Sequence, residues 1–533
     1  MIQSPLLRLH FAALAVTAAF GSPALLADDL GKPNIVFILA DDQGYGDVTA
    51  LNSNGKIPTP NIDRIAREGM FFTDAHTSSS VCTPTRYSVV TGRYHWRTRL
   101  QNGVLGGFSR PLIDADRLTV AGFLKGQGYH TSCVGKWHLG LDWPLKNGQV
   151  ADDAGDFSKG YEDGWKVDYT APIQHGPVDL GFDRFFGISA SLDMPPYVFI
   201  RDRVPTEVAT VEKAFFRKGP AGADFEAVDV LPAFAKEAVS IIADRAEAAK
   251  KGDPFFIYLP FNAPHTPIVP TPEWKGKSGI NDYADFTMQV DASVGQVLAA
   301  LDEHGLAGNT LLIFTTDNGC SPAANIPGLQ AAGHEPSYIY RGHKADIFEG
   351  GHRVPFVVRW PGKIAPGSKS DQLIGQIDLM ATCAEILGAK LPDTAGEDSV
   401  SFLPALLGQD TSGMRTGIVS QSINGSFAIR DGVWKLCLCP GSGGWSAPKP
   451  GKDDVSGLPE VQLYDLAADP GETKNLAPEH PDRIAAMKAS LASLIERGRS
   501  TPGPDLKNDV PIEMIKPHPA PKAGGKKAAG RKN

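Results

Sequence analysis

NIVFILADDQGYGD, residues 34–47, is the stretch of sequence that decides the fold. Its first seven residues are mostly apolar and branched, and two aspartates follow at once. PFFIYLPF (254–261) and TLLIFTTD (310–317) have the same form. Short apolar runs of this kind are typical of central strands that are buried on both faces. The three runs therefore predict three central strands of one sheet.

Helical patterns lie between these runs, over residues 60–69, 117–128, 232–250 and 282–304. In the last pattern, apolar residues recur at helical spacing until Gly305 ends it. Strands that alternate with helices predict an α/β fold, here a large mixed, mostly parallel sheet sandwiched by helices. In such sheets, ligands bind beyond the carboxyl ends of the strands, which is where DD, NAPH and DNG fall.

The sequence divides into four parts. Residues 1–27 contain one arginine, a short apolar run and small residues, which predicts a cleaved secretory signal peptide. Residues 28–400 hold the α/β pattern and are the expected catalytic domain. Residues 401–515 predict a smaller α+β domain with an antiparallel sheet and an amphipathic helix. Residues 516–533 are rich in Pro, Gly and Lys, and predict a disordered basic tail.

Charge and hydropathy restrict the function. The 533 residues carry a formal net charge of −8, and the part between the leader and the tail carries −15, because the leader holds one Arg and the tail six Lys and Arg. This acidity disfavours a nucleic-acid partner. No run reaches the roughly 18 apolar residues of a membrane helix. We therefore expect a periplasmic or secreted protein without stable membrane insertion.

Oxygen-bearing side chains follow two of the predicted strands. Asp41 and Asp42 come directly after the first run, and Asp317 and Asn318 end the third. Carboxylate and amide oxygens suit a hard cation such as Ca²⁺. Capping of a turn or helix is the alternative for either pair alone. Two such pairs at neighbouring strand ends favour a shared metal site.

Five cations and histidines lie in Gly- or Pro-bounded segments, where binding residues tend to be found. They are Arg86, Lys136, His138, His265 and Lys344. Each by itself is an ordinary surface cation or loop histidine. Together they would neutralise a tetrahedral anion and move protons for a leaving group.

Cys82 precedes a predicted helix, because Pro84 suits a first helical turn and Gly92 suits a helix end. At a helix N-terminus the side chain faces unpaired amides and a dipole that favours anions. A nucleophile, half of a disulfide and a buried thiol are all compatible with this position. The chain holds six cysteines, so an exported protein could also pair some of them.

CTPTR (82–86), followed by TG, resembles the C-x-P-S/A-R signature of type I sulfatases, members of the alkaline phosphatase superfamily. Thr85 occupies the position where serine is commonest. NIVFILADDQGYGD, TPNIDRIAREGM, GKWHLG, GFDRFFG, APHTP, TTDNG, KADIFEGGHRVPF and LYDLAADPGETKNL also resemble landmarks of that family, in order, over about residues 33–480. The resemblance implies an alkaline-phosphatase-like fold and a sulfuric ester hydrolase.

The resemblance also implies two cofactors. Cys82 would be oxidised by a maturation enzyme to formylglycine, whose hydrated form attacks sulfur through one hydroxyl and expels sulfate through the other. One Ca²⁺ per chain would be bound by Asp41, Asp42, Asp317, Asn318 and the modified Cys82.

Roles for the cations follow from the same resemblance. Arg86 would orient the diol, and His138 would assist it. Lys136 and Lys344 would hold the sulfate oxygens, and His265 would protonate the leaving oxygen.

The expected substrate is a sulfated carbohydrate or an aryl sulfate, and the lack of an obvious apolar lid favours a carbohydrate over a steroid or lipid. Residues 333–356 resemble bacterial polysaccharide sulfatases, including N-acetylgalactosamine-6-sulfatase-like members. His334, Arg341 and His343 are candidate sugar contacts, although a loop surface is an equal interpretation. SASLDMPPYVFIRDR (189–203) is a candidate pocket wall.

Two alternatives have different chemistry. A phosphate or phosphonate ester hydrolase of the same superfamily would share the sheet and the aspartates. A non-catalytic sulfoglycan-binding protein would keep Cys82 as a thiol.

Overall fold

The computed structural model describes residues 30–151 and 162–517. The predicted signal peptide (1–27) and nearly all of the predicted tail (516–533) lie outside the described residues. Among the described residues, ten strands form one sheet in the order β13-β2-β12-β11-β1-β10-β4-β5-β6-β7. In chain order the strands are β1 (Asn34–Ala40), β2 (Met70–Phe72), β4 (His130–Lys136), β5 (Arg184–Ile188), β6 (Ile200–Arg201), β7 (Val204–Pro205), β10 (Phe255–Pro260), β11 (Thr310–Thr316), β12 (Phe356–Arg359) and β13 (Ser368–Ser370).

The three apolar runs are neighbours at the centre of this sheet. β1 pairs in parallel with β10 on one side and with β11 on the other. All seven residues of β1 are buried, as expected for a strand covered on both faces. β12 runs antiparallel to β11 and to β2, which makes the sheet mixed. The predicted mixed, mostly parallel sheet is confirmed.

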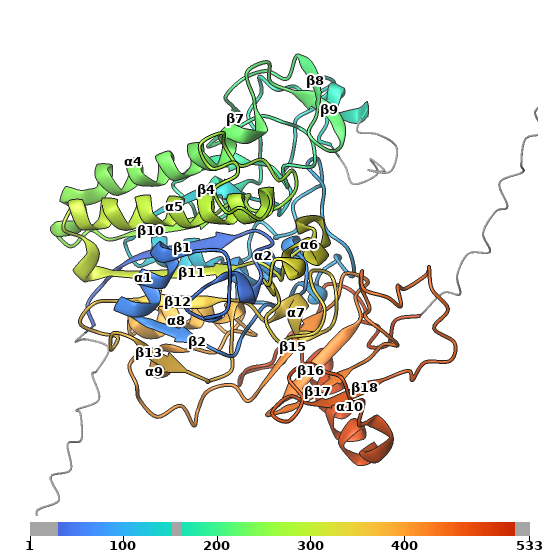
Figure 1. The fold of residues 1–533 in the computed structure, drawn as a ribbon. Helices are drawn as coiled ribbons and strands as arrows, with labels where there is room; N and C mark the ends of the chain where they lie inside the picture. Colours follow the sequence, from blue (N-terminus) through green and yellow to red (C-terminus); the bar gives the residue numbers. More distant parts are fainter. Residues whose placement is uncertain (1–29, 152–161, 518–533) are drawn as a thin grey trace, which may run out of the picture.

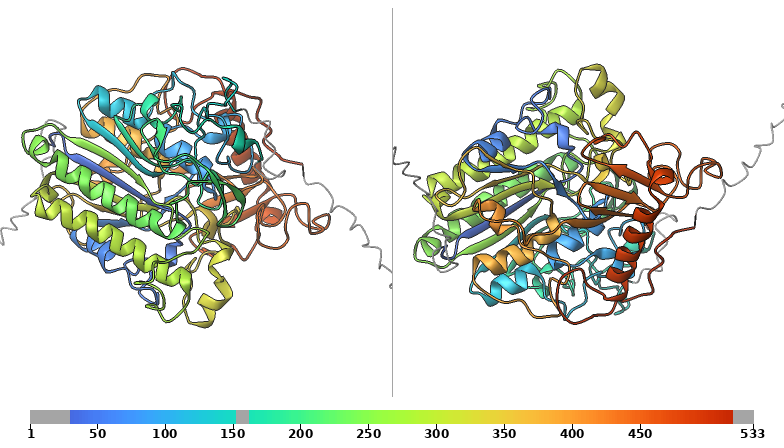
Figure 2. Two further views of the ribbon diagram at one scale, coloured as in Figure 1. Left: turned by 90° about the horizontal axis from the view of Figure 1, so that it is seen from above. Right: turned by 90° about the horizontal axis from the view of Figure 1, so that it is seen from below.

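Helices cover both faces of the sheet (Figures 1 and 2). The helices of the described chain are α1 (Pro60–Glu68), α2 (Cys82–Thr91), α3 (Val120–Gly126), α4 (Val230–Lys250), α5 (Asp282–Glu303), α6 (Ile326–Ala331), α7 (Glu349–His352), α8 (Leu379–Ile386), α9 (Leu403–Leu406) and α10 (Pro481–Glu496). α1, α4 and α5 pack on the face that carries Val36 and Ile38. α2, α3 and α8 pack on the opposite face, which carries Ile35 and Phe37. The alternation of side chains along β1 thus supplies two cores.

The four predicted central helices are present, with small shifts at their ends. The largest shift is at α3, which begins at Val120 rather than at residue 117. Thr119 caps this helix, because its side-chain oxygen accepts a hydrogen bond from the Gly122 amide. A capping threonine satisfies one of the free amides of the first turn and so determines where the helix begins.

The C-terminal part of the chain forms a second sheet beside the main one (orange to red in Figure 1). Its strands are β15 (Gly417–Gln421), β16 (Phe427–Asp431), β17 (Trp434–Cys437) and β18 (Gln462–Asp465). They pair antiparallel in that order. α10 packs on this sheet through Met487 and Leu491. The predicted antiparallel sheet and amphipathic helix are both present.

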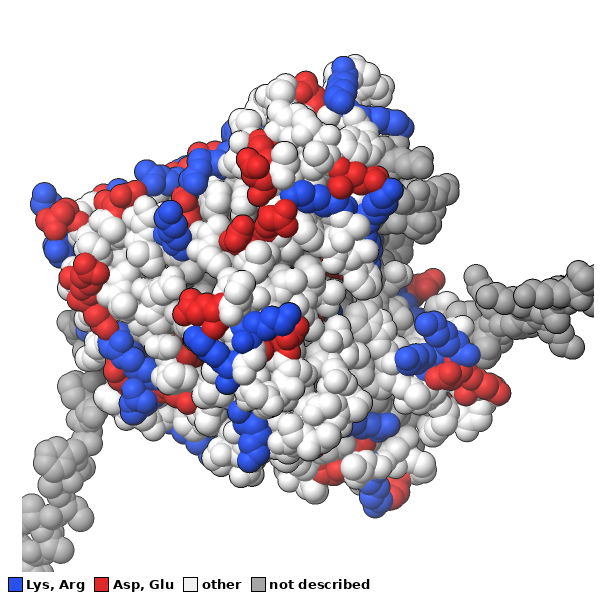
Figure 3. Space-filling view, turned by 45° about the horizontal axis from the view of Figure 1, so that its top comes forward, with Lys and Arg blue, Asp and Glu red and all other residues white. Residues whose placement is uncertain are grey.

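Two short two-stranded pairs, the first parallel and the second antiparallel, complete the described strands. They are β3 (Ala75–His76) with β14 (Ile374–Gly375), and β8 (Val211–Ala214) with β9 (Lys218–Ala221). Acidic and basic side chains lie intermixed on the face of the molecule in Figure 3. None of the helices in residues 30–151 and 162–517 is long and apolar enough to cross a membrane.

Candidate functional site

The two acidic pairs converge at the carboxyl edge of the central strands. Ala40 and Thr316 are register partners, so Asp41 and Asp317 leave β1 and β11 side by side. The Asp42 amide donates to Oδ1 of Asp317 over 3.3 Å. Nδ2 of Asn318 donates to Oδ1 of Asp42 over 2.7 Å. The parallel register of β1 and β11 therefore brings together two pairs of side chains that are separated by about 275 residues in the sequence.

α2 places Cys82 and Arg86 next to this acidic cluster. Cys82 is the first residue of the helix, and Gly92 ends it in the left-handed conformation with a φ of 64°. One turn after Cys82, the Arg86 guanidinium donates to Oδ2 of Asp317 from Nε and Nη2, over 3.0 and 2.7 Å. Its Nη1 donates to the carbonyl of Lys136. This arginine joins the helix to the ends of two strands.

Two lysines neutralise the aspartates. Nζ of Lys136 lies 2.6 Å from Oδ2 of Asp41, and Nζ of Lys344 lies 2.6 Å from Oδ1 of Asp42. Lys136 is the last residue of β4, although its flanking glycine suggested a loop. Gly135 has a φ of 139°, and a Cβ there would lie 1.9 Å from the Pro260 carbonyl oxygen. Glycine at 135 therefore permits close approach of β4 to β10 just before the lysine.

His265 and Ser191 lie on the same cluster. Nε2 of His265 is 3.7 Å from Oδ2 of Asp42. Oγ of Ser191 is within 3.2 Å of both Nζ of Lys136 and Nδ1 of His265. Sequence reasoning did not single out Ser191. The only signal was its place in the stretch 189–203, which was proposed as a pocket wall.

His138 has one ring nitrogen free among the described residues. Nε2 lies 2.7 Å from the Leu105 carbonyl oxygen, so this nitrogen carries the proton. Nδ1 is buried without a hydrogen-bond partner in the described chain. Burial, followed by the charge of Lys136, lowers the pKa of His138 well below its usual value. The ring is therefore neutral and offers Nδ1 as a hydrogen-bond acceptor.

The electrostatics of the cluster oppose a simple thiolate. Burial raises the pKa of the Cys82 thiol, and Lys136 and Lys344 offset this only in part. Burial also works to raise the pKa of Asp41, but Lys136, His265, Arg86 and Lys344 together hold it well below the usual range. An unmodified Cys82 is thus protonated and a weak nucleophile, whereas Asp41 is ionised.

The donor set fits a hard divalent cation. Oδ1 of Asp41 and Oδ1 of Asn318 are both buried and have no hydrogen-bond partner in the part of the chain that the structure describes. Buried oxygen atoms without a partner are costly unless something satisfies them. Two further carboxylates, from Asp42 and Asp317, border the same space. Four oxygen ligands of this kind suit Ca²⁺ or Mg²⁺ better than a soft metal.

A second group of potential ligands is already filled by a cation of the protein. His76, Glu349 and His352 offer ligand atoms within 4.8 Å of one another. Nζ of Lys435 lies 3.0 Å from both Oε1 of Glu349 and Nε2 of His352, and 2.8 Å from Glu472. The lysine supplies the positive charge there. This buried network joins β17 of the small sheet to α7.

The three candidate sugar contacts are placed differently from one another. His334 is fully buried, with Nε2 bonded to Asp47 and Nδ1 bonded to the Lys56 amide. Both ring nitrogens are therefore occupied, which leaves the predicted sugar contact without support. Arg341 donates to the Glu472 carbonyl over 2.8 Å and so faces the small sheet. His343, the residue before Lys344, lines a cavity.

Comparison with known proteins decides the family. The sulfatase family profile matches residues 33–389. The chain belongs to the sulfatase family. It is similar to N-acetylgalactosamine-6-O-sulfatase of Bacteroides thetaiotaomicron, with 34% identity over 87% of this chain and 94% of that protein. Arylsulfatase A of Bos taurus is 33% identical over 89% of this chain and 88% of its own length. This sulfatase is accordingly a sulfuric ester hydrolase.

Solved structures agree with the sulfatase fold. A structure from work on glycosaminoglycan metabolism by Bacteroides thetaiotaomicron superposes with a TM-score of 0.73 at 32% identity, over 87% of this chain and 99% of that one. A sulfatase from Pseudoalteromonas sp., at 23% identity, superposes with a TM-score of 0.65 over 87% of this chain and 90% of its own, and supports the fold alone. The predicted alkaline-phosphatase-like fold is confirmed.

Proposed function

We propose that this sulfatase removes sulfate from a sulfated saccharide, using a formylglycine made from Cys82 and a bound Ca²⁺. The proposal rests on the position of Cys82. This residue is the first of α2, one turn before Arg86, and it is close enough to Lys136 and Lys344 for their positive charges to act against the rise in its pKa. Because burial raises the pKa of the thiol, an unmodified Cys82 would be a weak nucleophile here, and this supports a modified side chain as the nucleophile. Once hydrated, formylglycine supplies a hydroxyl nucleophile for the sulfur atom.

The metal ligands that we propose are Asp41, Asp42, Asp317, Asn318 and the modified Cys82. A bound divalent cation supplies a Lewis acid that polarises the sulfate ester. Support for these ligands comes from the buried oxygens of Asp41 and Asn318 that have no partner among the described residues.

The remaining residues would bind the sulfate and transfer protons. Lys136 and Lys344 are buried cations whose Nζ atoms lie at the acidic cluster, where they can bind sulfate oxygens. Fixed donors around a developing charge often supply a large part of catalysis. His138 is neutral, so its Nδ1 can accept a hydrogen bond from the nucleophile and orient it. His265 is placed to donate a proton to the leaving alcohol, with Ser191 orienting its ring.

The name of one relative supports a saccharide as the substrate class. This relative, from Bacteroides thetaiotaomicron, is 34% identical over 87% of this chain and is named for a 6-O-sulfated N-acetylgalactosamine. We also propose export to the periplasm or beyond, activation by a maturation enzyme, and a division into a catalytic domain (28–400) and an α+β domain (401–515). The small antiparallel sheet supports this division.

Mass spectrometry of the peptide that contains Cys82 tests the mechanism directly. The protein is coexpressed with a formylglycine-generating enzyme, and the aldehyde is trapped with a hydrazine reagent. We expect a trapped aldehyde, together with sulfate release from sulfated saccharides that the Cys82→Ala variant lacks. An unmodified thiol in active protein would refute the mechanism. Release of phosphate from phosphate or phosphonate esters, faster than release of sulfate, would instead favour the related hydrolase activity.

A further inference from the structure

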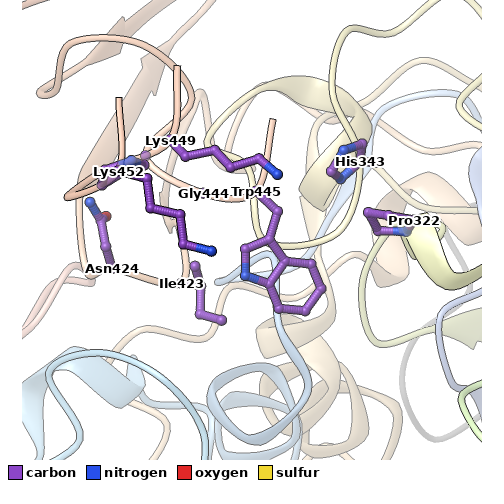
Figure 4. Close-up of a pocket in the computed structure, with 10 residues that line it drawn as sticks. Pro322, His343, Ile423, Asn424, Gly444, Trp445, Lys449 and Lys452 are labelled. Carbon is purple, nitrogen blue, oxygen red and sulfur yellow. The ribbon is translucent and has the colours of Figure 1, made fainter. Parts of the chain in front are cut away.

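A cavity of about 590 Å³ lies beside the catalytic cluster and is lined mainly by the loop 443–452 (Figure 4). Trp445 lines it, and the side chains of Lys449 and Lys452 extend toward this residue. Asn424 and His343 complete its polar lining. The residues that line the cavity include no carboxylate, so its charge is positive.

The loop is attached to the segment that carries Lys344. Oδ1 of Asp346, a buried carboxylate, accepts hydrogen bonds from the amides of Trp445 and Ser446 over 2.8 and 2.9 Å. A Cβ at Gly444 would lie 2.3 Å from the Ala345 carbonyl oxygen, so only glycine permits this close contact. One short segment therefore directs Lys344 into the sulfate site and holds Trp445 beside it.

The cavity and the proposed sulfate site at Lys344 lie close together. Nζ of Lys344 lies 5.9 Å from the centroid of the Trp445 ring. A sulfated sugar whose sulfate reached Lys344 would therefore place the next sugar of the same chain over the cavity. The cavity is thus a continuation of the reaction site rather than a separate pocket.

The lining has the chemistry of a site for an acidic sugar. Trp445 is 39% exposed, so its indole ring is accessible for stacking on the C–H face of a pyranose. Lys449 and Lys452 are exposed and form no ion pair with a carboxylate in the described parts of the chain. Unpaired lysines beside an exposed aromatic ring offer charge to an anion bound there.

We propose that this cavity is a subsite for the sugar adjacent to the sulfated one, and that it selects an adjacent sugar that bears a carboxylate or a second sulfate. Trp445 would stack on that sugar, and Lys449 and Lys452 would pair with its anionic group. This proposal rests on the proposed saccharide sulfatase function. It identifies the substrate as an acidic oligosaccharide rather than a sulfated monosaccharide.

The test compares three substrates on the formylglycine-containing enzyme. They are a disaccharide of 6-sulfated N-acetylgalactosamine and a hexuronate, the same disaccharide with the uronate methyl-esterified, and 4-nitrocatechol sulfate. The variants are Lys449→Ala/Lys452→Ala and Trp445→Ala. Lys390→Ala, an exposed lysine after α8, is the matched control.

We expect wild type to prefer the acidic disaccharide to its ester. The double lysine variant should reduce kcat/KM for the acidic disaccharide about tenfold more than for the aryl sulfate, since each exposed pair contributes up to about fivefold. It should also abolish the preference for acid over ester. Trp445→Ala should lower kcat/KM for both disaccharides more than it lowers kcat/KM for the aryl sulfate. Lys390→Ala should change none of these values.

Three other outcomes would overturn the proposal. Equal losses of kcat/KM on all three substrates would mean that the loop only supports the fold. A thermal unfolding scan would then show a lower Tm for the variants than for wild type. Aryl sulfate hydrolysis by wild type without any gain from the acidic disaccharide over its ester would refute the subsite alone. No hydrolysis of any sulfate ester by the formylglycine form would refute the proposed function, and the subsite with it.

Discussion

Arg86 and Asp317, 231 residues apart in the sequence, form a buried pair in which Nε and Nη2 of the arginine both donate to Oδ2 of the aspartate. Neither side chain is exposed to solvent. Because Arg86 lies one turn after Cys82 on α2 and Asp317 follows β11, this pair sets the distance between the proposed nucleophile and the proposed metal ligands.

Replacement of Arg86 should destabilise the fold as well as reduce activity. Arg86→Ala leaves Asp317 buried without its main partner, and breaking a buried pair in this way costs about 3–5 kcal/mol. Urea unfolding measures the change. Arg201→Ala removes an exposed pair with Glu237 and should cost less than about 1 kcal/mol. Equal changes in the two variants would mean that the Arg86–Asp317 pair contributes little.

Asp317→Ala should weaken calcium binding by more than about tenfold, because it removes one of the five proposed ligands. Calorimetric titration with Ca²⁺ measures the affinity, and the rise in Tm on adding Ca²⁺ provides a second readout. Asp302→Ala, which changes a partly exposed carboxylate at the end of α5, is the control. Unchanged affinity in Asp317→Ala would remove this residue from the proposed ligand set.

Lys136→Ala should lower kcat/KM about 10²- to 10³-fold, the usual cost of removing a fixed donor from a developing negative charge. The same fold-change on a saccharide sulfate and an aryl sulfate is expected, since Lys136 would contact the sulfate itself. Lys125→Ala, which loses a surface pair with Asp183, should retain wild-type kinetics. A normal kcat/KM in Lys136→Ala would place this lysine outside the sulfate site.

The buried network around Lys435 predicts a pH-dependent stability. Burial and the neighbouring Glu349 raise the pKa of Glu472 to about 7, although Lys435 opposes this. The native state then holds a proton that the unfolded state releases near its ordinary pKa of 4.5. The stability that Glu472 contributes is therefore present below about pH 4.5 and is lost as the pH rises through 7.

Lys435→Met removes the positive charge that favours ionised Glu472. It should therefore enlarge the loss of stability that occurs as the pH rises through 7. We expect the variant to be destabilised by about 3–5 kcal/mol, and by more at pH 8 than at pH 5. Urea unfolding of both proteins at the two pH values measures the difference. Lys435→Arg keeps the charge and serves as the comparison. A destabilisation of Lys435→Met that did not change with pH would contradict the electrostatic explanation.

Local sequence patterns were sufficient for the elements that carry the reaction site. The apolar run at 34–40 is typical of a central strand, and aspartates that follow such a strand are expected at the edge where parallel strands end. The helix that starts at Cys82 could be read from Pro84 and Gly92. The roles carried over for Arg86, Lys136 and Lys344 came from family resemblance, and the structure brings all three to the same acidic cluster.

Other features depended on contacts between distant segments. Ser191 has no motif of its own and gains its place only because β5 pairs with β4, next to Lys136. His334 looked like a sugar contact, but Asp47 and Lys56, far from it in the sequence, occupy both of its ring nitrogens. No periodicity or spacing along the chain encodes such partners.

The sequence by itself determined the fold class, the strand ends that carry the acidic pairs, and the family, because burial patterns and local motifs depend on residues close together in the chain. Only the tertiary structure decided which side chains share a site. Trp445 lies about 100 residues after Lys344, yet Asp346 holds its loop against the reaction site through two backbone hydrogen bonds. Such contacts join segments that are distant in the sequence, so their free energy depends on distances in space rather than in sequence.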